Sequence, residues 1–158
     1  MKIKILTVAA KAPAWVQQGY NEYAKRMPKG LSFELIEIAP SKHVNDTERF
    51  KAEEGERILG RIRDDDWVIA LDEQGTLWES AKLARSMEQW QMQGRDVVFA
   101  IGGSDGLSNT VKSRADQVVS LSKLTFPHHL VRVIVAEALY RAWTISAGHP
   151  YHRAKEKI

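Results

Sequence analysis

Residues 96–107 read DVVFAIGGSDGL, an apolar strand that runs directly into a glycine-rich loop. A strand without polar alternation is expected where helices cover both faces of a sheet. Residues 67–71, WVIAL, repeat this pattern and are followed by a second polar loop at 72–75. Because ligands bind beyond the carboxyl ends of parallel strands, these two loops and a third at 120–129 are candidates for a binding site. Taken alone, the glycine loop is explained about as well by a plain tight turn.

Strands and helices alternate along the rest of the chain. Further strands are predicted at 2–8, 31–38 and 117–121. Helices are predicted at 13–27, from a cap at Asp46 or Thr47 to about 63, at 79–93, from about 109, and at 130–146. No linker, repeat or low-complexity tract interrupts this order. The pattern predicts one α/β domain over residues 1–158, with a mainly parallel sheet sandwiched by helices.

Composition excludes several classes of protein. Of the 158 residues, 44% are hydrophobic and 27% are charged, as in soluble globular domains, so a disordered chain is not expected. The absence of cysteine excludes disulfides, cysteine–zinc sites and thiol nucleophiles. The apolar start, MKIKILTVAA, is too short for a signal peptide or a membrane span and is interrupted by Lys11, which predicts a cytoplasmic protein without membrane attachment.

The positive charge of the chain is small but unevenly distributed. A formal net charge of +3 permits nucleic-acid binding without requiring it. Basic residues and histidines gather at the end, where residues 149–158 read HPYHRAKEKI. At this stage a solvated tail and a functional tail explain the segment equally well.

Several common site motifs are absent. The loop glycines stand at 102, 103 and 106 and no GK[ST] follows, so the sequence contains neither a dinucleotide fingerprint nor a P-loop. The G-x-S-x-G motif of nucleophile-elbow hydrolases is also missing. The three aspartates at 64–66 are expected to form a solvated turn. The histidines at 128–129, 149 and 152 lack an acidic partner at ligand spacing, so no metal site is predicted.

Residues 120–129, SLSKLTFPHH, join a strand to the longest apolar helix. Backbone groups of such a loop can bind a heterocycle while Leu124 and Phe126 supply apolar contact. Taken alone, the segment is explained at least as well by an ordinary connector. In the following helix, Glu137 and Arg141 are spaced for an ion pair, on the helix or between subunits.

Four segments together resemble the SPOUT class of methyltransferases, and the resemblance covers essentially the whole chain. They are LDEQG at 71–75, FAIGGSDGL at 99–107, SLSKLTFPHHLVRVIVAEALYRAW at 120–143 and HPYHR at 149–153. The similarity is greatest to members that methylate large-subunit ribosomal RNA. It implies a deep trefoil knot within about residues 68–148, followed by the basic tail at 149–158, and a homodimer with active sites at the subunit interface.

The resemblance also implies the cofactor and the reaction. The cofactor is S-adenosyl-L-methionine, and the residues expected to hold it are Leu71, Gly102, Leu121, Ser122, Lys123, Leu124, Thr125 and Phe126. The reaction is methylation of N3 of a pseudouridine in 23S rRNA on the assembled ribosome.

The chemistry of this reaction suggests which side chains assist it. A ring nitrogen that attacks the methyl group in line must lose a proton, which a nearby base or cation assists. We predict that His128, His152 and Arg153 take this role. Tyr151 and Arg132 are expected to contact the target base, Tyr151 by stacking or hydrogen bonding.

Other hypotheses remain open from the sequence. A non-enzymatic RNA- or ribosome-binding protein of this fold would explain the basic tail but leave the cofactor loops without a purpose. The same enzyme class acting on another RNA, such as transfer RNA, is a second alternative, although the sequence shows no added RNA-binding domain. A nicotinamide-dependent enzyme is less well supported, because its fingerprint is absent.

Overall fold

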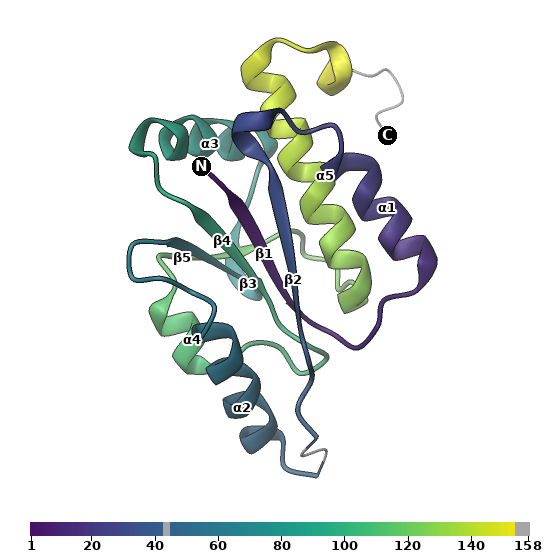
Figure 1. The fold of residues 1–158 in the computed structure, drawn as a ribbon, viewed down its shortest axis with the longest axis vertical. Coiled ribbons are helices and arrows are strands. Elements are labelled where there is room, and N and C mark those ends of the chain that lie inside the picture. Colours follow the sequence, from purple (N-terminus) through teal and green to yellow (C-terminus); the bar gives the residue numbers. More distant parts are fainter. Residues whose placement is uncertain (43–44, 154–158) are drawn as a thin grey trace.

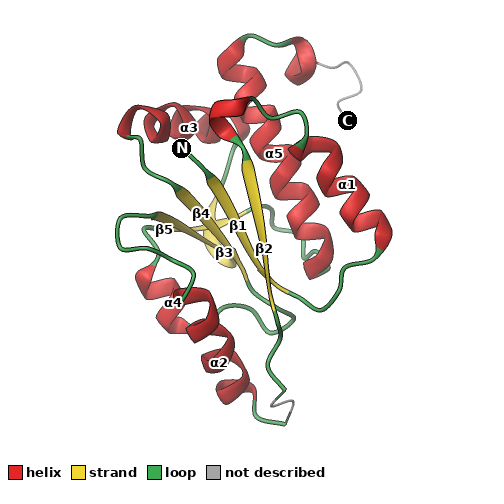
Figure 2. Cartoon of the chain, in the orientation of Figure 1, coloured by secondary structure: helices red, strands yellow, loops and turns green. Residues whose placement is uncertain are grey.

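The computed structural model describes residues 1–42 and 45–153, except for the side chain of Arg153. A five-stranded parallel sheet lies between two layers of helices, with α1, α3 and α5 on one face and α2 and α4 on the other (Figures 1 and 2). The strand order is β2-β1-β4-β3-β5. The predicted parallel α/β sandwich is confirmed.

The described chain alternates strands and helices as the sequence predicts. The strands are β1 (Ile3–Val8), β2 (Phe33–Ile38), β3 (Trp67–Leu77), β4 (Val97–Ile101) and β5 (Gln117–Ser120). The helices are α1 (Ala14–Ala24), α2 (Thr47–Leu59), α3 (Ser80–Gln93), α4 (Asn109–Arg114) and α5 (His128–Ala147), with short 3-10 turns η1 (Lys29–Leu31) and η2 (Pro150–Arg153). None of the described helices has both the length and the apolar character needed to span a membrane.

The position of β4 in the sheet explains why its sequence lacks polar alternation. All five of its residues are buried, because the strand lies in the middle of the sheet with helices over both faces. Phe99 belongs to the core under α3 and α5, and its ring lies 6.1 Å from that of Trp90. Val98 and Ala100 point to the opposite face and join the core under α2 and α4.

The helix ends follow the local signals in the sequence. Asp46 caps α2 by accepting a hydrogen bond from the Arg49 N–H at 3.1 Å. Gly94 and Gly148 end α3 and α5 in the left-handed conformation, with φ of 68° and 70°. Helix α5 begins at His128, two residues before the predicted start, directly after Pro127.

Strand β3 differs from its prediction. It was expected to end at Leu71, but it extends to Leu77. Leu71 and Thr76 both pair with Val119 of β5, so residues 72–75 leave the ladder and return to the same point. Gly75 lies against the Val119 backbone, where a Cβ on residue 75 would come within 2.6 Å. The close approach requires glycine, and nothing in the local pattern signals it.

The expectation of a solvated turn at 64–66 is wrong for Asp66. This side chain is 2% exposed and accepts a hydrogen bond from the Arg63 N–H at 2.8 Å. The ammonium group of Lys4 lies 3.6 Å from the same carboxylate oxygen. A buried carboxylate is tolerated here because it is hydrogen-bonded and paired with a cation.

Candidate functional site

A cavity of about 550 Å³ opens between residues 71–73 of β3 and the carboxyl ends of β4 and β5. The segment of β3 that leaves the ladder and the loops after β4 and β5 form most of its wall, and the first turn of α5 closes it. The cavity is lined by Leu71, Asp72, Glu73, Ile101, Gly102, Gly103, Ser104, Asp105, Gly106, Ser120, Leu121, Ser122, Leu124, Thr125, Phe126, Pro127, His128 and Val131. The structure thus brings together three loops that are far apart in the sequence.

The residues predicted to hold a cofactor gather at this cavity. All of them except Lys123 line it. Hydrogen bonds order the loop after β5: Ser120 Oγ donates to the Ser122 carbonyl at 2.8 Å, and the Leu124 N–H donates to Ser122 Oγ at 3.0 Å. The Leu124 side chain borders the cavity yet is 71% exposed, so it is available to cover an apolar group of a ligand.

In the glycine loop, main-chain atoms of residues without side chains form part of the cavity wall. A Cβ on Gly102 would lie 2.6 Å from the Gly106 carbonyl carbon, so the two strands of the loop are in direct contact. Gly106 donates its N–H to the Gly103 carbonyl at 3.1 Å and has φ of 83°, which favours glycine. A ligand can therefore approach the main chain closely here.

Three carboxylates on the cavity wall were missed by the sequence reasoning. Asp72 and Glu73 lie where β3 leaves the ladder with β5, and Asp105 lies in the glycine loop. Asp72 is paired with the ammonium group of Lys112 at 3.1 Å. The acidic wall favours a ligand that carries positive charge. The only sequence signal was the position of Asp72 and Glu73 directly after a buried strand.

His128, the first residue of α5, lines the cavity. Burial lowers the pKa of its imidazole, and the neighbouring His129 and Arg132 lower it further. The rings of His128 and His129 lie 4.3 Å apart between centroids. His128 is therefore neutral at pH 7, the state in which an imidazole accepts a proton.

Arg132, predicted to contact substrate, does not line the cavity within one chain. Its side chain is 1% exposed and lies beneath the first turns of α5. Its Nη1 is 3.3 Å from Oε2 of Glu37, the residue before the last of β2. Arg132 thus reaches the cavity only through its electrostatic effect on His128.

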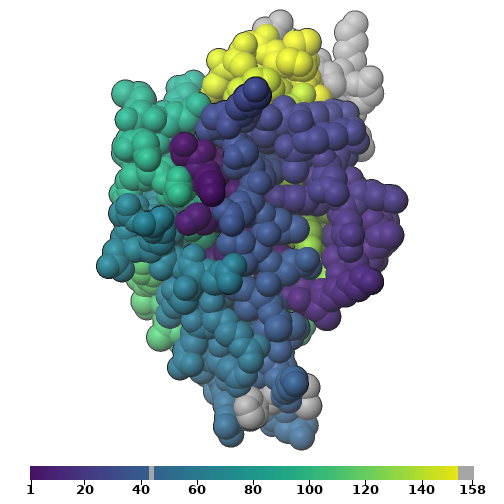
Figure 3. All heavy atoms as spheres, viewed as in Figure 1, coloured from purple at the N-terminus to yellow at the C-terminus, as the bar shows by residue number. Residues whose placement is uncertain are grey.

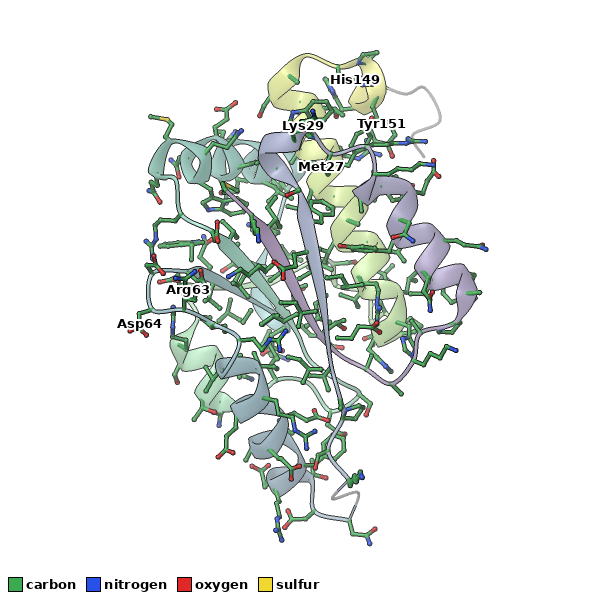
Figure 4. All side chains as sticks on the ribbon, in the orientation of Figure 1. Met27, Lys29, Arg63, Asp64, His149 and Tyr151 are labelled. Carbon is green, nitrogen blue, oxygen red and sulfur yellow. The ribbon has the colours of Figure 1, made fainter. Side chains whose placement is uncertain are left out.

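Residues 149–153 of the tail follow the end of α5, whereas the cavity lies at the start of that helix. The Tyr151 hydroxyl donates to Glu137 Oε1 at 3.1 Å, and the same oxygen accepts from Arg141 Nε at 2.9 Å, so the predicted pair between Glu137 and Arg141 forms on the helix. The Tyr151 ring also packs 4.7 Å from that of Tyr140. Figure 3 shows this end of the chain in yellow at the top of the molecule, and Figure 4 shows His149 and Tyr151 there.

Helix α5 sets the distance between tail and cavity. It has 20 residues, which corresponds to a length of about 30 Å. His128 stands at its start, whereas Tyr151 and His152 follow its end, so one chain does not bring them together. The side chain of Arg153 lies outside the described residues.

The described residues offer no group of three or more His, Asp or Glu side chains placed to hold a metal ion. The cavity instead combines backbone, apolar, hydroxyl and carboxylate groups with a single neutral imidazole. This combination suits an organic ligand with cationic character.

Comparison with known proteins identifies the family. The family model described as a predicted SPOUT methyltransferase matches residues 1–152. The chain belongs to the SPOUT methyltransferase family. Its cavity therefore lies in a methyltransferase, and residues 71–73 of β3 with the loops after β4 and β5 are the candidate active site of a SPOUT enzyme.

Two curated relatives of this SPOUT methyltransferase are similar over nearly its whole length. A protein of Hahella chejuensis named ribosomal RNA large subunit methyltransferase H is 52% identical over 155 residues, covering 97% of this chain and 99% of that protein. A protein of Chromohalobacter salexigens with the same name is 46% identical over 155 residues, covering 97% of this chain and 100% of that protein.

Proposed function

We propose that this methyltransferase uses S-adenosyl-L-methionine to methylate N3 of a pseudouridine in 23S rRNA on the assembled ribosome, in the cytoplasm. The observation that carries the proposal is the cavity built by residues 71–73 of β3 and the loops after β4 and β5, in a chain similar to two ribosomal RNA large subunit methyltransferases. A protein that only binds RNA would have no use for such a cavity.

The residues of the cavity fit the proposed cofactor. S-adenosyl-L-methionine has a sulfonium and an ammonium group, and when bound it supplies an electrophilic methyl group. Asp72, Glu73 and Asp105 offer negative charge to these cations. The exposed Leu124 and the neighbouring Phe126 offer apolar contact to an adenine ring, and the backbone of the glycine loop can be approached closely.

His128 is the described side chain best suited to handle the proton of the target nitrogen. It lines the cavity and is neutral at pH 7, because burial and nearby cationic groups lower its pKa. A neutral imidazole accepts the N3 proton as the nitrogen becomes nucleophilic. The buried guanidinium group of Arg132 helps to keep His128 neutral, because its positive charge disfavours the charged form of the imidazole.

We also propose that the active unit is a homodimer in which the tail of one subunit completes the cavity of the other. Residues 149–153 follow the end of α5, a helix about 30 Å long, and Tyr151 is held against Glu137 on that helix, so we propose that Tyr151, His152 and Arg153 assist from a second copy. Leu130 and Ile134 on α5 are half-buried and belong to neither core, and Trp15 on α1 is 57% exposed. A partner surface would cover these apolar side chains.

We propose that the part of the chain at about 68–148 is knotted, as in the SPOUT class that the sequence resembles. The support from the structure is local. Residues 72–75 leave the β3 ladder, pass against the backbone of Val119 at Gly75, and return to pair with Val119 again. A chain that crosses another strand so closely is compatible with threading of the later segment.

Transfer of radiolabelled methyl groups from S-adenosyl-L-methionine tests the function. The acceptors are intact ribosomes and isolated large subunits that lack the modification, with naked 23S rRNA as control. Label at N3 of a 23S rRNA pseudouridine from intact ribosomes alone is the expected result. Cofactor binding without label in any ribosomal acceptor would contradict the proposed substrate and point to another RNA.

A further inference from the structure

A buried carboxylate lies behind the glycine loop of the cavity. Glu54 of α2 is 3% exposed, and its Oε2 accepts a hydrogen bond from the Ser41 N–H at 3.1 Å. Its Oε1 faces Gly103, since a Cβ on Gly103 would lie 3.4 Å from this oxygen. Gly103 lines the cavity and Glu54 does not. The carboxylate therefore contacts the loop on the side away from the cavity.

The residue after Glu54 packs α2 onto the end of the same loop. A Cβ on Gly55 would come within 2.3 Å of Ser108 Oγ, so helix and loop are in direct contact. Ser108 in turn caps α4 by accepting a hydrogen bond from the Val111 N–H at 3.4 Å. Helix α2 thus supports the loop near both of its ends, at Gly103 and at Ser108.

The ionised form of Glu54 is unfavourable for folding. Burial raises the pKa of its carboxyl group, and Asp105 raises it further, against the opposing effects of the Ser41 N–H and Arg57. A glutamine could accept the Ser41 hydrogen bond without carrying a charge. A group that destabilises the fold yet lies against the wall of a ligand cavity is a candidate for a functional role.

We propose that Glu54 is a positioning residue for the cofactor, whose carboxylate holds the Gly103 backbone from behind and so sets the shape of the cavity wall. It touches neither cofactor nor substrate. The inference rests on the proposed use of S-adenosyl-L-methionine.

Calorimetric titration of the full chain with S-adenosyl-L-methionine and with its demethylated product tests the assignment. Glu54→Gln is expected to raise the Kd of both ligands about tenfold, because both depend on the shape of the wall. The kcat at saturating cofactor should stay within about twofold of wild type, since the reacting groups are untouched. Glu56→Gln removes the same charge from the exposed face of α2 and should change nothing.

A double-mutant cycle shows whether Glu54 acts through the loop. Gly103→Ala places a methyl group against the Glu54 carboxylate, so its effect on Kd should be strongly non-additive with that of Glu54→Gln. Equal affinity of Glu54→Gln and wild type, or strictly additive effects, would overturn the inference while leaving the proposed function intact. Absence of cofactor binding by the wild-type chain would overturn both.

Discussion

Gly75 lies so close to Val119 that a Cβ on residue 75 would come within 2.6 Å of the Val119 carbonyl carbon. The contact joins residues 72–75 of β3 to β5. Asp72 and Glu73 in the first segment, and Ser120 at the end of β5, line the candidate active site. Backbone on both sides of the contact leaves little room for adjustment.

Gly75→Ala is expected to destabilise the protein by about 1–3 kcal/mol, because the added methyl group overpacks a backbone crossing. Chemical denaturation with a circular dichroism readout measures this free energy of unfolding. Gly30→Ala is the matched control, since a Cβ on Gly30 would meet nothing within 4 Å. A Gly75→Ala variant as stable as Gly30→Ala would show that the crossing is looser than described.

Tail and cavity should complement each other between subunits. A Gly102→Val chain has a distorted cavity wall, because even a Cβ on residue 102 would lie 2.6 Å from the Gly106 carbonyl carbon, but its tail is unchanged. A Tyr151→Ala chain keeps the cavity. Each variant alone should be nearly inactive in methyl transfer, whereas an equal mixture refolded together should recover about a quarter of the wild-type rate. Half of the dimers are then mixed, and each carries one intact site.

Mixtures without any recovery would mean that the tail does not serve a partner's cavity. Size-exclusion chromatography with light scattering is the accompanying control, because a monomeric wild-type chain would by itself contradict the proposed homodimer.

The pH dependence of methyl transfer should reflect His128. Its lowered pKa means that the imidazole takes up a proton at a lower pH than an ordinary histidine, so the midpoint of the acid-side fall in kcat should lie below 6.5. His128→Asn should remove this acid limb and reduce kcat about a hundredfold. His129→Asn is the control: because His129 does not line the cavity, the variant should keep the acid limb, moved to higher pH since His129 no longer lowers the pKa of His128. An unchanged acid limb in His128→Asn would assign the proton acceptor elsewhere.

The stability of Glu54→Gln should exceed that of wild type at pH 7. The folded-state pKa of Glu54 is raised, so the fold disfavours its charged form, and this cost is fully present above the folded-state pKa. The difference should shrink as pH falls through that pKa toward the ordinary value for a glutamate. Thermal unfolding of both proteins between pH 4 and pH 8 measures it. A variant less stable than wild type at pH 7 would show that the charged carboxylate stabilises the fold.

Local patterns in the sequence determined the elements of the fold. The continuous apolar run of β4 predicted a strand covered on both faces, and the structure confirms Asp46, one of the two predicted caps, at the start of α2. These features depend on neighbouring residues along the chain, because hydrophobic periodicity and capping act within a few residues. The segments that line the cavity could be predicted for the same reason, since each directly follows an apolar run in the sequence, although the structure includes residues 72–75 in β3.

Only the tertiary structure decided which polar groups face one another. Arg132 meets Glu37, Asp66 is buried beside Lys4, and Glu54 lies behind Gly103, although these pairs are far apart in sequence. The tail likewise proved to be separated from its own cavity by the length of α5. Side-chain spacing along one element cannot encode such relationships. They depend on how helices and strands pack across the sheet, where burial and charge are set by residues from other parts of the chain.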